Sequence, residues 1–200
     1  ASVQLRAGVF GGGLDVTEQM GLFACEETGL AGFRVVHAKV REDTRGSFTK
    51  VYHEEAFREL GLATDFREEY YSVSRKDVLR GMHFQLPPAD HEKLVWCMSG
   101  EVLDVVLDLR RASATYGEHR CFTLTGGSGM MLYIPRGMAH GFLTRSEEAV
   151  MMYKVTSVYA PDFDAGIRWD TAGIDWGIAA PLLSERDRSF AALADFSSPF

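Results

Sequence analysis

The sequence predicts a mainly β protein with a few short helices, folded as a β-sandwich or barrel of the jelly-roll kind. Short runs rich in β-branched and aromatic residues follow one another from residue 32 onward. Turn residues separate these runs, as at Pro87-Pro88 and Gly126-Gly127. Within several runs apolar and polar residues alternate, which is the period of a strand and not of a helix. Strands joined by turns favour a sandwich or barrel over βαβ units.

The chain of 200 residues is expected to form one domain with an appendage. Its hydrophobic fraction of 46% and aromatic fraction of 12% are ample for a core. Residues 1–21 contain Gly11-Gly12-Gly13 and show little periodicity, so we expect an N-terminal extension there. Residues 22–200 are expected to form the single domain.

Charge and cysteine content restrict the partners and the compartment. A net charge of −7 and a pI near 5.4 argue against nucleic acid or an anionic membrane as a partner. An anionic small ligand would need a local cluster of cations. Three cysteines without CxxC spacing suggest neither a disulfide framework nor a zinc site. Since the chain also has no run of 18 apolar residues, we expect a soluble protein of the reducing cytoplasm.

The expected elements follow the chain from residue 32. Residues 32–40 and 47–53 have strand composition, with the turn "EDTRGS" between them. Residues 54–62 have the spacing of a short amphipathic helix closed by Gly61. Residues 184–195 are expected to be helical, with Ser184 as N-cap and Asp187 at the third helical position. Further strands are expected at 70–74, 78–84, 93–100, 101–109, 119–125, 129–135, 140–144 and 149–160.

Two of these strands carry polar residues on an otherwise apolar pattern. In "EVLDVVLDL", residues 103, 105, 107 and 109 form an apolar face, while Asp104 and Asp108 share the opposite face with valines. A mixed face of this kind suits a strand beside a polar cavity. In "KLVWCM", Lys93 falls on the face opposite Leu94 and Trp96. Lys93 either lines a cavity or blunts the end of an edge strand.

The segment "VLRGMHFQ" places a cation and an imidazole within one expected strand. His83 and Gln85 alternate with Met82, so both should lie on the face opposite Met82. Strict alternation would put Arg80 on the other face. If Arg80 and His83 serve one site, Gly81 must break the period at a bulge.

The segment "GMMLYIPRGMAHGF" carries the second motif of the cupin superfamily, in which His140 would be a metal ligand. The first cupin motif would supply two histidines and a glutamate, but here it reads His83-Phe84-Gln85, with Glu92 at a longer spacing. Since one imidazole is missing, we expect no metal. A metal-dependent cupin oxygenase or isomerase is the alternative of another class, and a non-catalytic sugar-nucleotide binding module is a third.

The sequence resembles the dTDP-4-dehydrorhamnose 3,5-epimerase family over about residues 23 to 190. The resemblance rests on ordered motifs: "DTRGSF", "VLRGMHFQLPP", "KLV", "SGEVLDVVLDLRRASATYG", "YIPRGMAHGF", "EEAVMMYKVTSVYAP", "GIRWD", "GIDW" and "LLSERD". It implies a cupin-type jelly roll, a homodimer, and an isomerase that needs no metal or other cofactor. The implied reaction inverts carbons 3 and 5 of a nucleotide-diphosphate-linked 4-keto-6-deoxy sugar, in deoxysugar and polysaccharide biosynthesis.

The resemblance assigns a role to each candidate residue. Epimerisation next to a carbonyl needs a base, a cation at the enolate oxygen, and an acid on the opposite face. His83 matches the base, Lys93 the cation and Tyr153 the acid. Asp187 matches the carboxylate that orients His83, although a capping role towards Ser184 is the alternative. The positions implied to contact the substrate are Arg45, Arg80, Gln85, His140 and Tyr159, the arginines being suited to a diphosphate.

Three substrate-binding positions depart from the family pattern. Lys50 stands where the family usually has glutamate, Glu68 where it has glutamine, and Tyr70 where it has asparagine. These changes suggest the same chemistry on a different substrate. A CDP- or GDP-linked sugar, whose base offers an exocyclic amine to Glu68, is one variant. Epimerisation at one carbon only is another.

Overall fold

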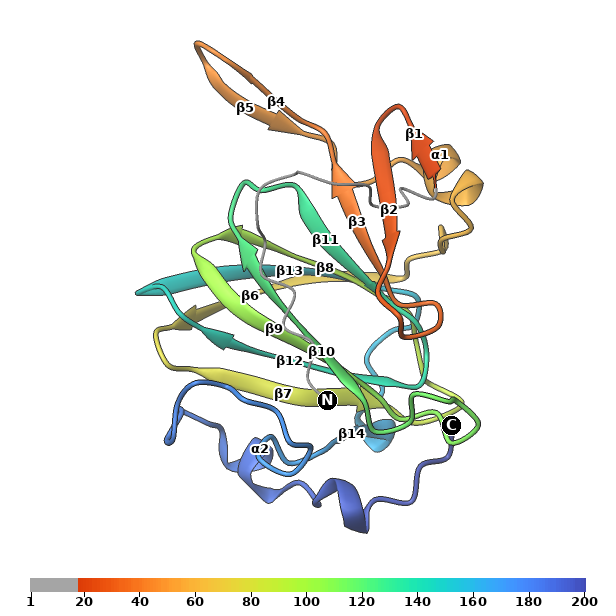
Figure 1. Ribbon diagram of the computed structural model, residues 1–200, viewed down its shortest axis with the longest axis vertical. Helices are drawn as coiled ribbons and strands as arrows, with labels where there is room; N and C mark the ends of the chain where they lie inside the picture. The colour runs from red at the N-terminus through yellow and green to blue at the C-terminus, as the bar shows by residue number, and fades with distance from the viewer. Residues whose placement is uncertain (1–17) are drawn as a thin grey trace.

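The protein is a two-layered β-sandwich, as the sequence predicts. The computed structural model describes residues 18–200, and residues 1–17 of the expected extension lie outside this range. A seven-stranded sheet, in the order β1-β2-β3-β11-β8-β13-β6, faces a five-stranded sheet in the order β10-β9-β12-β7-β14 (Figure 1). All neighbouring strands in both sheets are antiparallel.

The strands of the larger sheet come from both halves of the chain. They are β1 (Glu18–Met20), β2 (Phe23–Glu27), β3 (Arg34–Ala38), β6 (Glu68–Arg75), β8 (Lys93–Ser99), β11 (Met130–Ile134) and β13 (Glu148–Val155). Since β1 pairs with β2, the domain boundary expected after residue 21 falls inside a hairpin of this sheet.

The smaller sheet is mostly built from the middle of the chain. It contains β7 (Leu79–Gln85), β9 (Glu101–Asp108), β10 (His119–Thr125), β12 (Met138–Thr144) and β14 (Asp164–Gly166). A separate hairpin, β4 (Val40–Asp43) with β5 (Gly46–Thr49), projects away from the sandwich (Figure 1). The helical segments are α1 (Glu54–Glu59), η1 (Pro161–Phe163), α2 (Glu185–Ser189) and η2 (Leu193–Asp195).

The alternation in the sequence sorts side chains into three apolar layers. The inner faces of both sheets meet in one cluster, which includes Val95 from β8 and Val106 from β9. Leu94 lies on the outer face of the larger sheet, in the layer that contains Phe57 of α1. Leu103 lies on the outer face of the smaller sheet, beneath the C-terminal segment. The predicted faces of both strands are confirmed.

The two α-helices are short, and their N-terminal caps explain where they begin. The imidazole of His53 accepts a hydrogen bond from Ala56 N–H, and Gly61, at φ +68°, follows the end of α1. Ser184 caps α2 by accepting from Asp187 N–H at 3.0 Å, as predicted. The helix expected over 184–195 is wrong beyond residue 189. Phe190 is extended there and turns its ring onto Gly166 of the smaller sheet.

Gly81 breaks the alternation of β7, as the sequence requires for a shared site. His83 pairs with His140 and Arg80 with Phe142, so the register shifts by one residue between the two pairs. Gly81 adopts φ +145°, and a Cβ there would come within 2.5 Å of Gly141 Cα. Arg80 and His83 consequently share the inner face of the sheet.

The described residues contain no helix long and apolar enough to cross a bilayer.

Candidate active site

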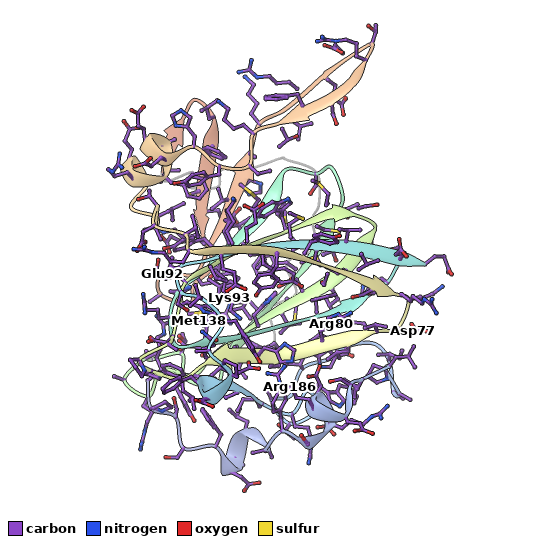
Figure 2. The ribbon with its side chains drawn as sticks, turned by 180° about the vertical axis from the view of Figure 1, so that it is seen from behind. Asp77, Arg80, Glu92, Lys93, Met138 and Arg186 are labelled. Atoms are coloured by element: carbon purple, nitrogen blue, oxygen red, sulfur yellow. The ribbon has the colours of Figure 1, made fainter. Side chains whose placement is uncertain are left out.

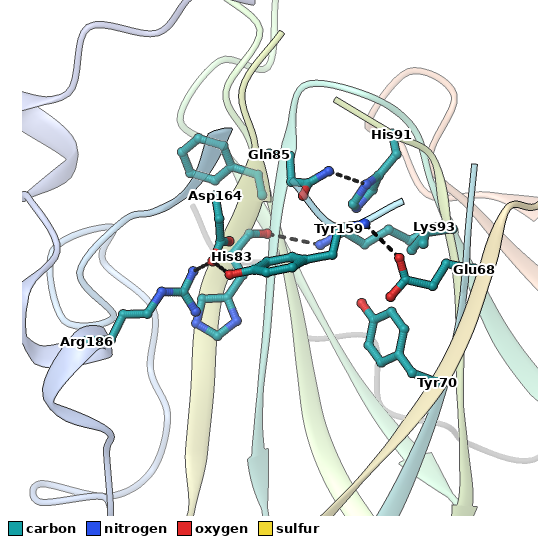
Figure 3. Close-up of a pocket in the computed structure, with 11 residues that line it drawn as sticks. Glu68, Tyr70, His83, Gln85, His91, Lys93, Tyr159, Asp164 and Arg186 are labelled. Atoms are coloured by element: carbon teal, nitrogen blue, oxygen red, sulfur yellow. Dashed lines mark hydrogen bonds and ion pairs between the residues drawn. The ribbon is translucent and has the colours of Figure 1, made fainter. Parts of the chain in front are cut away.

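A cavity of about 300 Å³ opens between the two sheets at one end of the sandwich. Figure 2 shows Lys93 on one sheet and Arg80 on the other, with Arg186 on the C-terminal segment. Figure 3 shows the side chains that line the cavity, which are Glu68, Tyr70, His83, Phe84, Gln85, His91, Lys93, Val155, Tyr159, Asp164 and Arg186. Residues from β6, β7, β8 and β14 thus meet around one space.

The imidazole of His83 is held by the carboxylate of Asp187, which lies 104 positions later in the chain. His83 Nε2 lies 2.8 Å from Asp187 Oδ1. The other carboxylate oxygen accepts from Gly81 N–H at 3.3 Å. Asp187 is buried, and its own N–H is the one that Ser184 caps. Asp187 therefore fills both roles that the sequence left open.

The charges of this pair follow from their surroundings. Burial raises the pKa of Asp187, but hydrogen bonds from His83 and Gly81 N–H outweigh it, and the pKa lies below its usual value. Burial lowers the pKa of His83, against the opposing effect of Asp187. At neutral pH an ionised carboxylate therefore faces a neutral ring. The carboxylate holds the ring proton on Nε2 and leaves Nδ1 as the basic nitrogen.

Lys93 projects from the larger sheet towards the strand that carries His83. Its ammonium donates to His83 O at 3.2 Å, and only 7% of the residue is exposed. Burial lowers the pKa of Lys93 to about 8, while Asp164 and Asp104 act in the opposite direction. Lys93 lines the cavity, and the alternative of a lysine that blunts a strand edge is wrong.

Two tyrosines form a stacked pair on the wall opposite His83. Tyr70 of β6 and Tyr153 of β13 are cross-strand partners, with ring centroids 4.7 Å apart and planes inclined by 16°. Tyr70 lines the cavity, whereas Tyr153 is buried against the far side of the Tyr70 ring. The hydroxyl of Tyr153 lies 3.0 Å from Ser72 Oγ. Burial raises the pKa of both phenols, to about 12 for Tyr70.

Tyr159 crosses the mouth of the cavity (Figure 3). Its hydroxyl donates to Asp164 Oδ2 at 3.2 Å, and its backbone N–H donates to Glu68 Oε2 at 2.7 Å. Tyr159 therefore connects the β14 side of the cavity to the β6 side.

Arg80 and His140 lie near this site but do not line the open space. Arg80 Nε donates to Ser74 Oγ at 2.9 Å. His140 Nε2 lies 2.8 Å from Asp104 Oδ2, and both residues are buried. The mixed face predicted for β9 thus carries a second histidine–aspartate pair. The ring of His140 packs edge-on to Tyr153.

Gln85 lines the cavity, but its amide holds the neighbouring loops. Its Nε2 donates to Ala89 O at 2.8 Å, and its Oε1 accepts from Ala160 N–H at 2.7 Å. Both the nitrogen and the oxygen of the Gln85 amide are therefore hydrogen-bonded to the backbone of this chain.

Arg45 and Lys50 lie away from the cavity of their own chain. Arg45 is at the turn of the projecting hairpin, 88% exposed at its side chain and paired with Asp43. Lys50 follows β5 and is exposed. The hairpin keeps both residues away from this cavity, because β4 and β5 pair only with each other.

Three polar residues that line the cavity were not identified from the sequence: His91, Asp164 and Arg186. Arg186 Nη2 lies 2.6 Å from Asp164 Oδ2, and His91 Nδ1 lies 2.9 Å from Ser157 Oγ. Arg186 precedes Asp187 in the "SERD" motif, which was a usable signal. Asp164 and His91 gave none. Lys93 and Arg186 supply the cations that an anionic ligand would need in an acidic protein.

Within residues 18–200 no cluster of three or more His, Cys, Asp or Glu side chains is arranged to hold a metal. His83 and His140, the histidines of the two cupin motif segments, are each paired with a carboxylate.

Comparison with known proteins agrees with this geometry. A family model described as dTDP-4-dehydrorhamnose 3,5-epimerase matches residues 27–195. The dTDP-4-dehydrorhamnose 3,5-epimerase of Methanothermobacter thermautotrophicus is 39% identical over 181 residues, which cover 88% of this chain and 97% of that protein. The dTDP-4-dehydrorhamnose 3,5-epimerase of Bacillus anthracis, solved with TDP and PPi bound, superimposes with a TM-score of 0.83 at 33% identity, covering 86% of this chain and 99% of that one.

A second solved structure is the dTDP-6-deoxy-D-glucose-3,5-epimerase of Legionella pneumophila, in complex with dTDP-4-keto-L-rhamnose. It has a TM-score of 0.83 and 31% identity, and the match covers 88% of this chain and 95% of that chain. The family model and the curated relative each match most of the sequence, and the solved structures share its fold. The chain belongs to the dTDP-4-dehydrorhamnose 3,5-epimerase family.

Proposed function

We propose that this protein epimerises a dTDP-linked 4-keto-6-deoxy sugar by removing and returning protons next to the keto group. The observation that carries the proposal is the His83–Asp187 pair on one wall of the cavity with the Lys93 ammonium beside it. The substrates in the names of the relatives support the choice of sugar and nucleotide.

The residues divide the reaction between the two walls. His83 Nδ1 takes the proton from the carbon next to the carbonyl, and the electron pair moves onto the carbonyl oxygen. The Lys93 ammonium stabilises that oxyanion. Removing one preorganised donor of this kind typically raises a barrier by about 3–4 kcal/mol. A phenol of the Tyr70–Tyr153 pair returns a proton to the opposite face of the carbon.

The diphosphate would lie towards Arg186, whose guanidinium is oriented by Asp164 at the cavity wall. Arginine is suited to this role because its planar donors match phosphate oxygens. Arg80 is proposed to act beside the sugar, since it shares the inner face of β7 with His83.

The most informative experiment measures hydrogen exchange into the sugar in D₂O. Incubation with dTDP-4-keto-6-deoxyglucose, followed by NMR, should show deuterium at carbon 3, carbon 5 or both. His83→Asn should abolish the exchange, while His119→Asn, a histidine outside the cavity, should not. A non-catalytic binding module predicts no exchange in the parent protein, and that result would end the proposal. Activity that depended on added metal or on O₂ would favour the oxygenase alternative.

A CDP- or GDP-linked sugar is the second candidate substrate, and Glu68 is the observation that favours it. This carboxylate lines the cavity, and its Oε2 accepts a hydrogen bond from Tyr159 N–H. Its Oε1 has no hydrogen-bond partner among the described residues. The other oxygen could accept from the exocyclic amine of cytosine or guanine. Titration with dTDP, CDP and GDP separates the candidates, since tighter binding of dTDP would exclude the altered base.

We infer a homodimer in which the projecting hairpin of one copy reaches the cavity of the other. Arg45 and Lys50 match substrate-contacting positions yet lie outside their own cavity. The outer face of the larger sheet exposes apolar side chains, including Tyr71 and Met98, which a second copy could cover.

Mixing two inactive variants tests this arrangement. Arg45→Ala and His83→Asn copies are each expected to be inactive, but a mixed dimer would contain one intact site. Exchange should therefore recover towards about a quarter of the parent rate per chain after random reassociation. No recovery in a solution shown by light scattering to contain mixed dimers would contradict the hairpin's role.

The thiols of Cys97 and Cys121 suit the reducing cytoplasm, where we place the reaction.

A further inference from the structure

We propose that Phe190 is a positioning residue that holds both the base His83 and the cation Arg186 at one wall of the cavity. This inference rests on the proposed epimerisation and concerns how its base and its diphosphate site are kept in place. None of the motifs that carry the family resemblance includes Phe190. The ring lies where α2, β7 and β14 meet, in contact with a residue of each.

The first observation is the space beside the imidazole of His83. Gly166 of β14 is the cross-strand partner of His83 on β7, so side chains at these two positions project from the same face of the sheet. A Cβ at Gly166 would come within 2.4 Å of the Phe190 ring. The glycine therefore leaves the space next to the base to the ring of Phe190.

The second observation is the contact between the two rings. The centroids of His83 and Phe190 lie 5.7 Å apart, and the ring planes are inclined by 74°. Edge-to-face packing of this kind is a favoured arrangement of aromatic rings. The carboxylate of Asp187 holds the imidazole at Nε2, and Phe190 restricts its tilt about that hydrogen bond. The two contacts together fix both the direction and the plane of the base.

The third observation is the support that the same ring gives to Arg186. The guanidinium carbon of Arg186 lies 5.0 Å from the centroid of Phe190, which is a cation–π contact. On its other side the guanidinium binds Asp164, with Nη2 at 2.6 Å from Oδ2. The side chain of Arg186 is 44% exposed, so these two contacts limit rotamers that a diphosphate would otherwise have to order.

The ring of Phe190 also keeps water from the base. Burial lowers the pKa of His83, so the imidazole is neutral at neutral pH, as a base must be. Without the ring this effect weakens and the pKa should rise. Arg186 also lowers the pKa of His83, so its release would act in the same direction, whereas loss of Asp187 would act in the opposite one. The charged and titratable groups around His83 are Asp187 and Arg186 of α2, Lys93 of β8, Asp164 of β14, Glu68 and Tyr70 of β6, Tyr159 at the mouth, and the His140–Asp104 pair.

The test measures the pKa of His83 by NMR titration of its ring protons, which are assigned by comparison with His83→Asn. Phe190→Leu keeps an apolar side chain after α2 but removes the flat ring. We expect the pKa of His83 to rise and the acid limb of kcat/KM for deuterium exchange to move to higher pH with it. The rate should fall by about 10- to 100-fold because the base is less well oriented. Binding of dTDP should weaken by about 2- to 5-fold through Arg186.

Two further variants separate positioning from general packing. Phe196→Leu is the matched control, because Phe196 lies in the same C-terminal segment and packs against Phe84 on the outer face of the smaller sheet. It should lower the melting temperature without moving the pKa of His83. Gly166→Ala would displace the Phe190 ring from the other side and should reproduce the rise in that pKa. Added to Phe190→Leu, it should have little further effect.

The proposal is overturned if a folded Phe190→Leu protein keeps the parent pKa of His83 and the parent rate. It is equally overturned if that pKa falls, as loss of the Asp187 contact would cause, or if Phe196→Leu produces the same rise. The titration needs no turnover, so it decides the role of Phe190 even if the parent protein shows no exchange. Absence of exchange would instead refute the epimerase function itself.

Discussion

Replacing Asp187 by asparagine changes one oxygen to an amide nitrogen beside the proposed base. The carboxylate accepts from His83 Nε2 at 2.8 Å in a buried setting. A hydrogen bond to a charged group contributes about 1.5–3 kcal/mol, which corresponds to a rate loss of about 10- to 150-fold. An asparagine NH₂ would also donate to Nε2 and move the ring proton to Nδ1. The same substitution costs about 10⁴-fold in a Ser-His-Asp triad, so we expect a loss between about 10-fold and 10⁴-fold.

The assay is deuterium exchange into the 4-keto sugar, measured as kcat/KM across pH. Because Asp187 raises the pKa of His83, its removal should also move the acid limb of the profile to lower pH. Glu185→Gln, in the same helix but exposed, is the control and should match the parent. A loss below about threefold in a folded Asp187→Asn protein, or an unchanged acid limb, would refute the role assigned to the pair.

Three other expectations follow from buried or constrained groups. The charged form of Lys93 is lost as pH rises through its pKa of about 8, so the rate should fall above that pH; Lys93→Arg should lower the rate but remove this alkaline limb. Gly81→Ala should destabilise the fold by about 2–6 kcal/mol in urea unfolding, because its Cβ would meet Gly141 Cα and its φ is positive. Asp104→Ala should cost about 3–5 kcal/mol, since His140 would lose its buried partner. This loss should lower the melting temperature by roughly 6–20 °C.

The parts of the site that could be predicted from the sequence were those that depend on strand periodicity. In β8 the alternation put Lys93 on the inner face, and in β7 the need to unite Arg80 with His83 required a break at Gly81. Both features depend on neighbouring residues in one strand, where a period of two decides which side a residue faces.

The remaining features depend on how separate strands meet. The stack of Tyr70 on Tyr153 arises from the register of β6 against β13, which no local pattern specifies. Arg45 lies away from the cavity of its own chain because β4 pairs only with β5, which the sequence motif does not reveal. The C-terminal segment was expected as one helix because its composition is helical. Packing of Phe190 on Gly166 ends that helix early.

The long separation between His83 and Asp187 has a consequence for biosynthesis. A nascent polypeptide that has emerged from the ribosome only as far as β13 already contains His83 and Lys93, and both sheets can pair apart from β14. It still lacks the carboxylate that sets the ring tautomer. Catalytic competence should therefore appear late in translation, after α2 has docked beneath the smaller sheet. Chains that end before α2 would lack both Asp187 and Arg186, so they should not turn over a nucleotide sugar.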